Sequence, residues 1–223
     1  MRTTILYCCP VPAKGPEHIE LAYRFVASML EFPPGYECEL IVISNGGPPS
    51  SEMQVLFCAL PCFKRFFCHD DTGWDIGGFQ QAAKSVVASE ILLMFGGNAY
   101  FKRSGWLHRM ITAYDKHGPH LYGTFGCTVH TPHIRTTGFW LPTELFNRYP
   151  KQVRTHEERY DFEHRNGSLT QWVQSEGRRA IMVTWSAEYG PQYWGQVPGA
   201  YMSGDHSECL CADRISDLIA PPR

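Results

Sequence analysis

Residues Cys68–Gln80, with the sequence CHDDTGWDIGGFQ, decide how we interpret this chain. The stretch places acidic and glycine residues between the apolar pair Phe66-Phe67 and a helical pattern over Phe79–Val87. A strand that runs into a glycine-rich turn and then a helix is how α/β proteins form a ligand crevice. For any single aspartate the alternative is a solvated loop residue that caps the next helix. Because three carboxylates gather in this turn, we favour a functional role for the cluster.

The elements around this stretch alternate between strands and helices. We expect strands over Thr3–Cys9, Glu39–Ser44, Arg65–Cys68 and Glu90–Phe95, and helices over Glu17–Glu31, Gln54–Ala59 and Gly77–Ala88. The run ELIVIS at Glu39–Ser44 is apolar almost throughout, which is typical of a parallel strand covered on both faces. This order predicts an α/β fold with a mainly parallel central sheet, flanked by helices and built with right-handed crossovers.

The second half of the chain predicts a mixed arrangement. We expect a helix over Gly105–His117, strands over Leu121–Val129 and Ile134–Leu141, a helix over Leu169–Glu176, a strand over Ala180–Trp185 and a last helix over Asp213–Ile219. In the first helix of the chain, the spacing of apolar residues predicts a buried face made of Ile19, Tyr23, Val26 and Leu30.

Composition excludes several classes of protein. Of the 223 residues, 43% are hydrophobic and 19% are charged, which is typical of a globular protein with a sizeable core. The formal net charge of −2 gives no basic excess, so nucleic acid is not the expected partner. No segment approaches the roughly 18 consecutive apolar residues of a transmembrane helix. The N-terminal residues lack the hydrophobic region of a signal peptide.

The cysteines indicate a reducing compartment. The chain has nine of them, an odd number, and they do not form paired C-x-x-C motifs, which disfavours a structural zinc site. Most are expected to be small buried apolar residues. We therefore expect a cytoplasmic protein.

The carboxyl ends of the expected strands supply the candidate site, because open α/β sheets bind ligands there. We assign a nucleotide-binding role to Pro10, Lys14, Asn45, Asp71, Gly73, Asp75, Gly97 and Asn98. Carboxylates and amides can bind a base and ribose, and glycines let backbone N–H groups approach phosphate. The chain contains neither G-x-G-x-x-G nor G-x-x-x-x-G-K-[ST], which argues against a dinucleotide oxidoreductase and a P-loop NTPase.

Several short motifs together resemble a known family. They are VISNG at Val42–Gly46, DTGWDIG at Asp71–Gly77, the strand Ile91–Phe95 followed by Trp106-Leu107, TTGFW at Thr136–Trp140, and Phe162-Glu163-His164 with Ser168–Thr170. On these residues the chain resembles a small GT-A-fold glycosyltransferase, near the family 2 type and its rhamnan-synthesis-like branch. The resemblance covers about residues 3–185.

This resemblance implies one GT-A (Rossmann-like) domain over residues 1–223. Residues 1–100 would form the nucleotide-binding half, 101–185 the acceptor and catalytic half, and 186–223 a C-terminal extension. The implied reaction moves a sugar from a UDP-, dTDP- or GDP-sugar to an acceptor hydroxyl of a glycan, polysaccharide or glycolipid precursor, with inversion.

One departure from the family pattern concerns metal. Similar enzymes usually end the fourth strand in Asp-x-Asp, which binds Mg²⁺ or Mn²⁺ on the diphosphate, whereas this chain has Gly96-Gly97-Asn98. The amide of Asn98 is a weaker ligand for a hard divalent ion than a carboxylate. We therefore assign no residue as a metal ligand, and expect any Mg²⁺ or Mn²⁺ to arrive with the nucleotide diphosphate. There are three alternatives: other residues bind the metal, cations and backbone N–H groups replace it, or the protein is catalytically inactive. The candidate replacement cations are Lys102, Arg103, Arg135 and His206.

The resemblance also implies a catalytic base in the second half. An inverting transfer needs a carboxylate that accepts the proton of the acceptor hydroxyl. Glu163 is the first candidate and Asp161 the second; the alternative is an exposed charged segment. We assign acceptor or sugar binding to Arg135, Thr137, Trp140 and Trp172. Because sugars pack on aromatic rings, Trp74, Trp185 and Trp194 are further candidates.

Two other functions stay open. A non-catalytic nucleotide- or sugar-binding module on the same fold would explain the missing Asp-x-Asp motif. A sugar nucleotidyltransferase would need a basic glycine-rich loop after the first strand, and residues Pro10–Gly15 are a poor version of one. His130 and His133 suggest metal, but the sequence shows no third ligand at a useful spacing.

Overall fold

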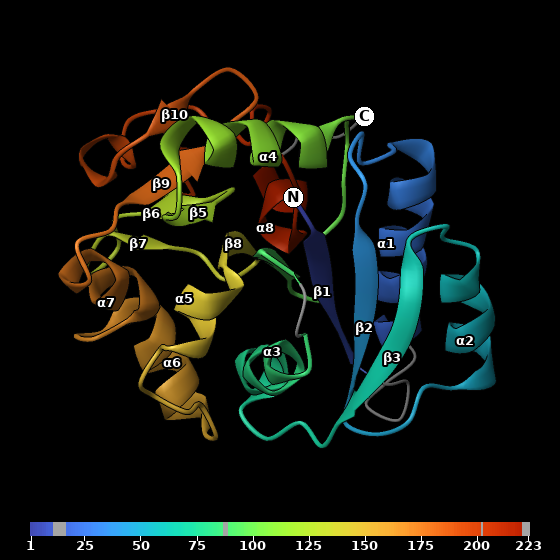
Figure 1. The fold of residues 1–223 in the computed structure, drawn as a ribbon. Helices are drawn as coiled ribbons and strands as arrows, with labels where there is room; N and C mark the ends of the chain where they lie inside the picture. Colours follow the sequence, from blue (N-terminus) through green and yellow to red (C-terminus); the bar gives the residue numbers. More distant parts are fainter. Residues whose placement is uncertain (11–16, 87–88, 202, 220–223) are drawn as a thin grey trace.

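The computed structural model describes residues 1–10, 17–86, 89–201 and 203–219 (Figure 1). Its strands are β1 (Thr3–Pro10), β2 (Glu39–Asn45), β3 (Phe63–His69), β4 (Ile91–Phe95), β5 (Leu121–Gly123), β6 (Gly126–Cys127), β7 (His133–Ile134), β8 (Gly138–Pro142), β9 (Ala180–Val183) and β10 (Glu188–Tyr189). Its α-helices are α1 (Glu17–Glu31), α2 (Ser51–Cys58), α3 (Trp74–Lys84), α4 (Trp106–His117), α5 (Thr143–Asn147), α6 (His156–His164), α7 (Leu169–Ser175) and α8 (Arg214–Ile219).

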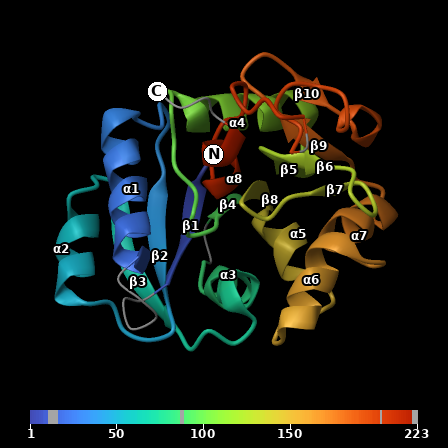
Figure 2. The same cartoon turned by 180° about the vertical axis from the view of Figure 1, so that it is seen from behind.

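One sheet dominates the described part of the chain, with strand order β10-β9-β5-β8-β4-β1-β2-β3. Strand β1 pairs in parallel with β2 and with β4, and β2 pairs in parallel with β3. The four strands of the N-terminal half therefore end at the same edge of the sheet. Helices lie on both faces of the sheet, as Figures 1 and 2 show from opposite sides. The predicted mainly parallel α/β fold is confirmed.

The second half joins this sheet through β8, which pairs antiparallel with both β4 and β5. The two long strands expected over Leu121–Val129 and Ile134–Leu141 are each divided. Their outer parts leave the main sheet and pair with each other as β6 and β7. Sequence analysis also missed α5 and α6, which cover the same side of the sheet as α3. The division of the chain into three functional parts stays an interpretation.

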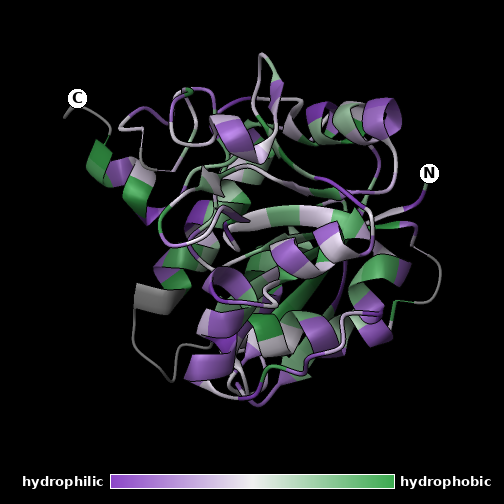
Figure 3. Cartoon of the chain, turned by 90° about the vertical axis from the view of Figure 1, so that its left-hand side faces the viewer, coloured by the Kyte–Doolittle hydropathy of each residue, from purple (hydrophilic) through white to green (hydrophobic). Residues whose placement is uncertain are grey.

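The sheet separates two apolar layers, and β1 shows how alternation produces them. Ile5, Tyr7 and Cys9 face the layer beneath α1, α2 and α4, while Leu6 and Cys8 face the layer beneath α3. Figure 3 shows the hydrophobic colours on the strands and the hydrophilic colours mainly on the outer helix faces. None of the described helices is long and apolar enough to cross a membrane.

The predicted buried face of α1 is partly wrong. Tyr23 and Leu30 are 46% and 52% exposed, whereas Phe25 and Met29 are buried together with the correctly predicted Val26. The helix has two overlapping apolar stripes, and the sheet covers the one that contains Phe25. The ring of Phe25 stacks on Tyr7 with 3.8 Å between centroids, which decides the orientation of the helix.

Candidate functional site

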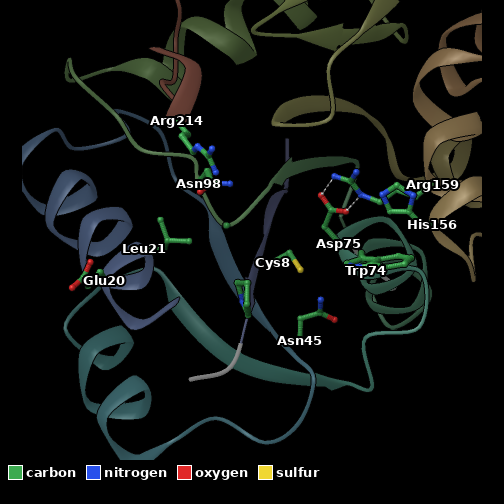
Figure 4. Close-up of a pocket in the computed structure, with 12 residues that line it drawn as sticks. Cys8, Glu20, Leu21, Asn45, Trp74, Asp75, Asn98, His156, Arg159 and Arg214 are labelled. Atoms are coloured by element: carbon green, nitrogen blue, oxygen red, sulfur yellow. Dashed lines mark hydrogen bonds and ion pairs between the residues drawn. The ribbon is translucent and has the colours of Figure 1, made fainter. Parts of the chain in front are cut away.

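A cavity of about 650 Å³ lies at the carboxyl ends of the parallel strands (Figure 4). It is lined by Cys8, Pro10, Glu20, Leu21, Asn45, Trp74, Asp75, Gly97, Asn98, His156, Arg159 and Arg214. The lining therefore comes from the ends of β1, β2 and β4, from the start of α3, and from α1, α6 and α8. Cavities of roughly 300–1,000 Å³ are the usual size for small ligands and cofactors.

The floor of the cavity depends on Gly97, directly after β4. A Cβ at this position would lie 3.0 Å from Pro10 Cδ and 3.1 Å from the carbonyl oxygen of Cys8. The hydroxyl of Tyr7 donates a hydrogen bond to the Gly97 carbonyl oxygen at 2.9 Å. The missing side chain thus lets the loop after β4 pack directly against the end of β1.

The turn between β3 and α3 has an unusual backbone. Asp71, Gly73 and Trp74 have φ values of 76°, 76° and 54°. A Cβ at Gly73 would lie 2.2 Å from the carbonyl oxygen of Val153, so only glycine fits there. Left-handed backbone at a non-glycine residue costs about 1–2 kcal/mol and is concentrated at functional sites. The turn places the indole of Trp74, 40% exposed, on the rim of the cavity, edge-on to His156.

A polar network fixes the orientation of Asn45 at the end of β2. The Asn45 amide nitrogen donates to the Asp71 carboxylate, and Asn45 Oδ1 lies 2.6 Å from His69 Nδ1. Asn45 and His69 are both nearly fully buried, so these bonds form away from bulk water. Asp71 therefore lies behind the cavity wall and positions Asn45, which does line it.

An ion pair between Asp75 and Arg159 forms one side of the cavity. Arg159 Nε lies 2.6 Å from Asp75 Oδ1, and Nη2 lies 3.2 Å from Oδ2 (Figure 4). The side chain of Arg159 is 34% exposed and that of Asp75 is 18% exposed. Two parallel bonds fix the plane of the guanidinium, which leaves its remaining N–H donors with a defined direction. Asp75 therefore positions Arg159.

A second arginine, Arg214 at the start of α8, lies beside Asn98 in Figure 4. Asp217 ties α8 to α1, because its carboxylate accepts from both terminal nitrogens of Arg24 at 2.8 and 2.5 Å. The hydroxyl of Tyr100 donates to the same carboxylate at 2.6 Å. The cavity thus lies between two guanidinium groups from distant parts of the sequence.

Comparison with known proteins found no matching family model and no matching curated protein. Solved structures do match. A mannosyltransferase, PcManGT from Pyrobaculum calidifontis in complex with GDP-Man and Mn²⁺, has a TM-score of 0.57 at 11% identity, over 82% of this chain and 54% of that one. TarS 1-349 from S. aureus in complex with UDP has a TM-score of 0.50 at 13% identity, over 71% of this chain and 53% of that one.

A protein assigned as a glucose-1-phosphate thymidylyltransferase, from Bacillus anthracis, has a TM-score of 0.53 at 8% identity, over 84% of this chain and 88% of that one. The chain has the GT-A fold. It spans about half the length of the matched mannosyltransferase and TarS chains. At these identities the likeness concerns the fold alone.

Within this GT-A fold, the structure brings together most of the predicted nucleotide-binding residues. Those that line the cavity are Pro10, Asn45, Asp75, Gly97 and Asn98. Asp71 and Gly73 lie behind its wall and shape it. Lys14 falls outside the described residues.

The cations that the sequence suggested in place of a metal lie elsewhere in the GT-A fold. Lys102 and Arg103 lie over the rings of Tyr100 and Trp185, Arg135 pairs with Glu163, and His206 is buried with its Nδ1 2.8 Å from Ser216 Oγ. None of the four is among the described residues that line the cavity, and their replacement of a metal stays a prediction. Among the described residues, Arg159 and Arg214 are the arginines that line the cavity.

The donors at the end of β4 do not fit a protein-bound Mg²⁺ or Mn²⁺ ion. Asp75 and Glu20 are the carboxylates among the described lining residues, and Glu20 lies on α1, away from β4 in Figure 4. Both oxygens of Asp75 already accept hydrogen bonds from Arg159. A hard divalent ion requires several oxygen ligands, and the amide of Asn98 alone is a weak one.

The two candidate bases, Glu163 and Asp161, lie outside the lining of the cavity. Glu163 is 5% exposed and does not line the cavity; its Oε2 accepts from Thr136 Oγ1 at 2.6 Å, and its Oε1 lies 2.8 Å from Arg135 Nη1. Asp161 is 33% exposed and lies 3.0 Å from Arg165 Nη1. Glu163 was expected at the mouth of the cleft, and the residues that line the cavity do not include it. Their catalytic role stays a prediction.

The predicted sugar-binding residues do not line the cavity either. Trp140 is fully buried and stacks on Tyr122, with ring centroids 5.5 Å apart, so it belongs to the core. Trp172 packs edge-on against Tyr149, and Trp194 is fully buried. Thr137 lies closer to the site, because its carbonyl oxygen accepts from the backbone N–H of Gly96 at 3.1 Å.

Sequence analysis missed His156, Arg159 and Arg214. One signal for the first two was available: Thr155 and Glu158 form a capping box, and this pattern marks the start of a helix. The helix would have placed His156 and Arg159 three residues apart, on one face. No local signal marks Arg214, which reaches the cavity only because α8 packs against α1.

Proposed function

We propose that this protein is a glycosyltransferase that moves a sugar from a nucleotide-sugar donor to an acceptor hydroxyl of a glycan, polysaccharide or glycolipid precursor. The observation that carries the proposal is the position of Arg159, oriented by Asp75 at the carboxyl ends of the parallel strands. A diphosphate needs positive charge, and guanidinium groups bind phosphate through paired hydrogen bonds. Arg214 supplies a second positive charge in the same cavity.

The other cavity residues have roles that fit a nucleotide sugar. Asn45 presents a fixed amide for a base or ribose, and the exposed indole of Trp74 offers a surface for stacking. The absence of a side chain at Gly97 keeps the loop after β4 against the end of β1, so that the backbone of this loop stays at the floor of the cavity. UDP-, dTDP- and GDP-sugars all match this set of contacts.

The two arginines also fit the chemical step. When the acceptor oxygen attacks the anomeric carbon, the sugar–phosphate bond breaks and negative charge develops on the departing diphosphate. Arg159 and Arg214 would stabilise that charge, and any Mg²⁺ or Mn²⁺ would arrive with the nucleotide diphosphate. Because Asp75 fixes the Arg159 guanidinium before the donor binds, little reorganisation accompanies the reaction.

An inverting course is the finer part of the proposal, with Glu163 as the base and Asp161 as the second candidate. For Glu163 to accept a proton, its carboxylate would have to separate from Arg135. Arg135 has a second contact, since its guanidinium lies 4.2 Å from the centroid of the Tyr201 ring. A guanidinium that remained on Tyr201 would leave Glu163 available to an acceptor.

A sugar nucleotidyltransferase is the second candidate, and the match to the thymidylyltransferase structure, over 84% of this chain and 88% of that one, favours it. Such an enzyme joins a sugar phosphate to a nucleotide and releases pyrophosphate. A non-catalytic nucleotide- or sugar-binding module would bind the same ligands without turnover. The three functions differ in their products.

The test measures those products. The protein is incubated with UDP-, dTDP- and GDP-sugars, with and without EDTA, and released nucleoside diphosphate is quantified; a parallel reaction contains sugar 1-phosphates and nucleoside triphosphates. We expect slow release of nucleoside diphosphate from one donor, lost in Arg159→Gln. Arg148→Gln is the matched control, because Arg148 is a surface arginine paired with Glu176 outside the cavity. Pyrophosphate release would support the nucleotidyltransferase, and binding without any product would support the module.

A further inference from the structure

A cluster of three potential metal ligands lies outside the cavity, where α6 ends beside β7 (Figure 2). His133 comes from β7, and Glu163 and His164 are the last two residues of α6. Their ligand atoms all lie within 4.8 Å of one another. Nε2 of His133 and Nε2 of His164 each lie 3.8 Å from Glu163 Oε1. We refer to these residues as the His-Glu-His cluster.

His133 has the environment of a metal-binding histidine. It is fully buried, and its Nδ1 lies 2.7 Å from the carbonyl oxygen of Thr131, to which Nδ1–H donates. The proton on Nδ1 leaves a lone pair on Nε2, which is buried, points towards Glu163 and has no hydrogen-bond partner. A backbone carbonyl that accepts from the second ring nitrogen is the usual support of a histidine ligand.

Glu163 is held in a similar way, whereas Nδ1 of His164 is buried without a hydrogen-bond partner. The Glu163 carboxylate is positioned through Oε2, which accepts from Thr136 Oγ1 at 2.6 Å, so Oε1 faces the histidines. The ring of His164 is perpendicular to that of His133, with centroids 4.5 Å apart. His164 thus brings a second imidazole to the Glu163 carboxylate, with its Nε2 3.8 Å from Oε1.

We propose that His133, Glu163 and His164 bind one divalent transition-metal ion, with Zn²⁺ as the best fit. Two imidazole nitrogens and one carboxylate oxygen are a ligand set that zinc accepts, whereas Mg²⁺ prefers oxygen alone. Bonds of about 2.0–2.2 Å to a tetrahedral ion place neighbouring ligand atoms roughly 3.3–3.5 Å apart. The two 3.8 Å separations from Glu163 need only a small contraction, and the third pair, the two histidine nitrogens, lies within 4.8 Å and has to close to the same distance.

Arg135 is the residue that opposes ion binding. Its Nη1 lies 2.8 Å from Glu163 Oε1, and two positive centres would compete for that oxygen. Its contact with the Tyr201 ring gives the guanidinium another position of low energy. The site thus contains a competing cation, and removing its charge is expected to tighten metal binding. This opposite effect distinguishes metal binding from a general loss of structure.

The ion would join β7 to the end of α6 without touching the donor cavity, since none of the three residues lines that cavity. Any ligand that binds the folded state but not the unfolded one raises stability. Zinc should therefore raise the melting temperature of the protein. A zinc ion on Glu163 would exclude this carboxylate as the base of the proposed transfer and would leave Asp161 in that role. The measurements of zinc binding themselves need no donor or acceptor.

The test uses the full chain, treated with a chelator and then titrated with Zn²⁺ in calorimetry and with Co²⁺ in absorbance spectroscopy. We expect about one ion per chain, a tetrahedral Co²⁺ spectrum and a raised melting temperature. His164→Gln should weaken binding at least about 10-fold, since each ligand contributes directly, and Arg135→Gln should strengthen it. His108→Gln is the matched control, because His108 is an exposed histidine on α4.

Several outcomes would overturn the proposal. Unchanged zinc affinity in a folded His164→Gln variant would exclude the cluster, as would weaker binding in Arg135→Gln. The nine cysteines of the chain offer other zinc ligands, and a sulfur-to-cobalt charge-transfer band would assign the ion to them instead. His133 is fully buried, so a His133→Gln variant is interpreted only if circular dichroism shows that it folds; the two other variants decide the question without it.

Discussion

Replacement of Arg159 by glutamine should weaken the binding of a nucleoside diphosphate while leaving nucleoside binding almost unchanged. Glutamine keeps much of the length of the side chain and removes its charge. Arg159 makes two bonds to Asp75 and lines the cavity with its remaining donors. The loss should therefore grow with the number of phosphate groups on the ligand.

The magnitude follows from the contacts. A hydrogen bond to a charged group contributes about 1.5–3 kcal/mol, and 1.4 kcal/mol is a factor of ten in Kd. The Arg159 side chain is 34% exposed, so solvent screening reduces its interaction with a phosphate. We expect a 10- to 100-fold weaker Kd for UDP or GDP. The unpaired Asp75 should also lower the stability of the free protein by roughly 1–2 kcal/mol.

Calorimetry with a nucleoside, its monophosphate and its diphosphate measures this dependence, and a double-mutant cycle with Asp75→Asn extends it. Because Asp75 acts through Arg159, Asp75→Asn should have the smaller effect, and the double variant should bind no worse than Arg159→Gln alone. Equal losses for nucleoside and diphosphate would indicate a general distortion. Additive losses would show that Asp75 contacts the ligand itself. Either result would refute the role given to the pair.

Three further predictions concern the shape of the cavity. Gly97→Ala should weaken diphosphate binding, because its Cβ would lie 3.0 Å from Pro10, and a crystal structure should show the loop displaced. Trp74→Ala should weaken the binding of nucleoside and of diphosphate by a similar factor. If a base stacks on the indole, roughly 1–3 kcal/mol of binding free energy is lost, which fluorescence titration measures. The bond from Arg24 lowers the pKa of Asp217 below 3.8, so its stabilising effect is complete above that pH and is lost as the pH falls through the lowered value. In Asp217→Asn, the free energy of unfolding should therefore fall less steeply as the pH is lowered. The variant should also bind nucleotide more weakly, because Arg214 would be displaced.

Much of the fold could be predicted from local patterns in the sequence. The apolar run of β2 and the glycine-rich turn before α3 identified parallel strands whose carboxyl ends line a cavity, because both signals act over a few residues. The divided strands around β6 and β7 could not be predicted in this way, because their pairing depends on which segments the main sheet leaves uncovered. The buried stripe of α1 was misjudged for a related reason: the choice of Phe25 over Tyr23 depends on Tyr7, a distant residue.

The candidate site was predictable where it follows a strand and unpredictable where it does not. Asn45, Asp75 and Gly97 come directly after strands or open the next helix, so the topology rule found them. Arg159 and Arg214 come from helices that cross the edge of the sheet late in the chain, and only tertiary packing brings them to the cavity. The misplaced Glu163 shows the reverse case, since a motif that resembles a catalytic one lies in a buried ion pair with Arg135.

The glycine at position 96 and the presence of Arg159 are two parts of one arrangement of charge. A Cβ at Gly96 would lie 3.8 Å from Asp75 Oδ2, so an aspartate at position 96 would bring a second carboxylate close to the first. Two neighbouring carboxylates need a metal ion or a shared proton. With glycine at position 96, the single charge of Asp75 is balanced by Arg159, and the guanidinium is left to face the cavity. Glycine at position 96 therefore leaves Asp75 without a second carboxylate beside it. Arg159, which pairs with Asp75, places a permanent positive charge where a diphosphate would lie.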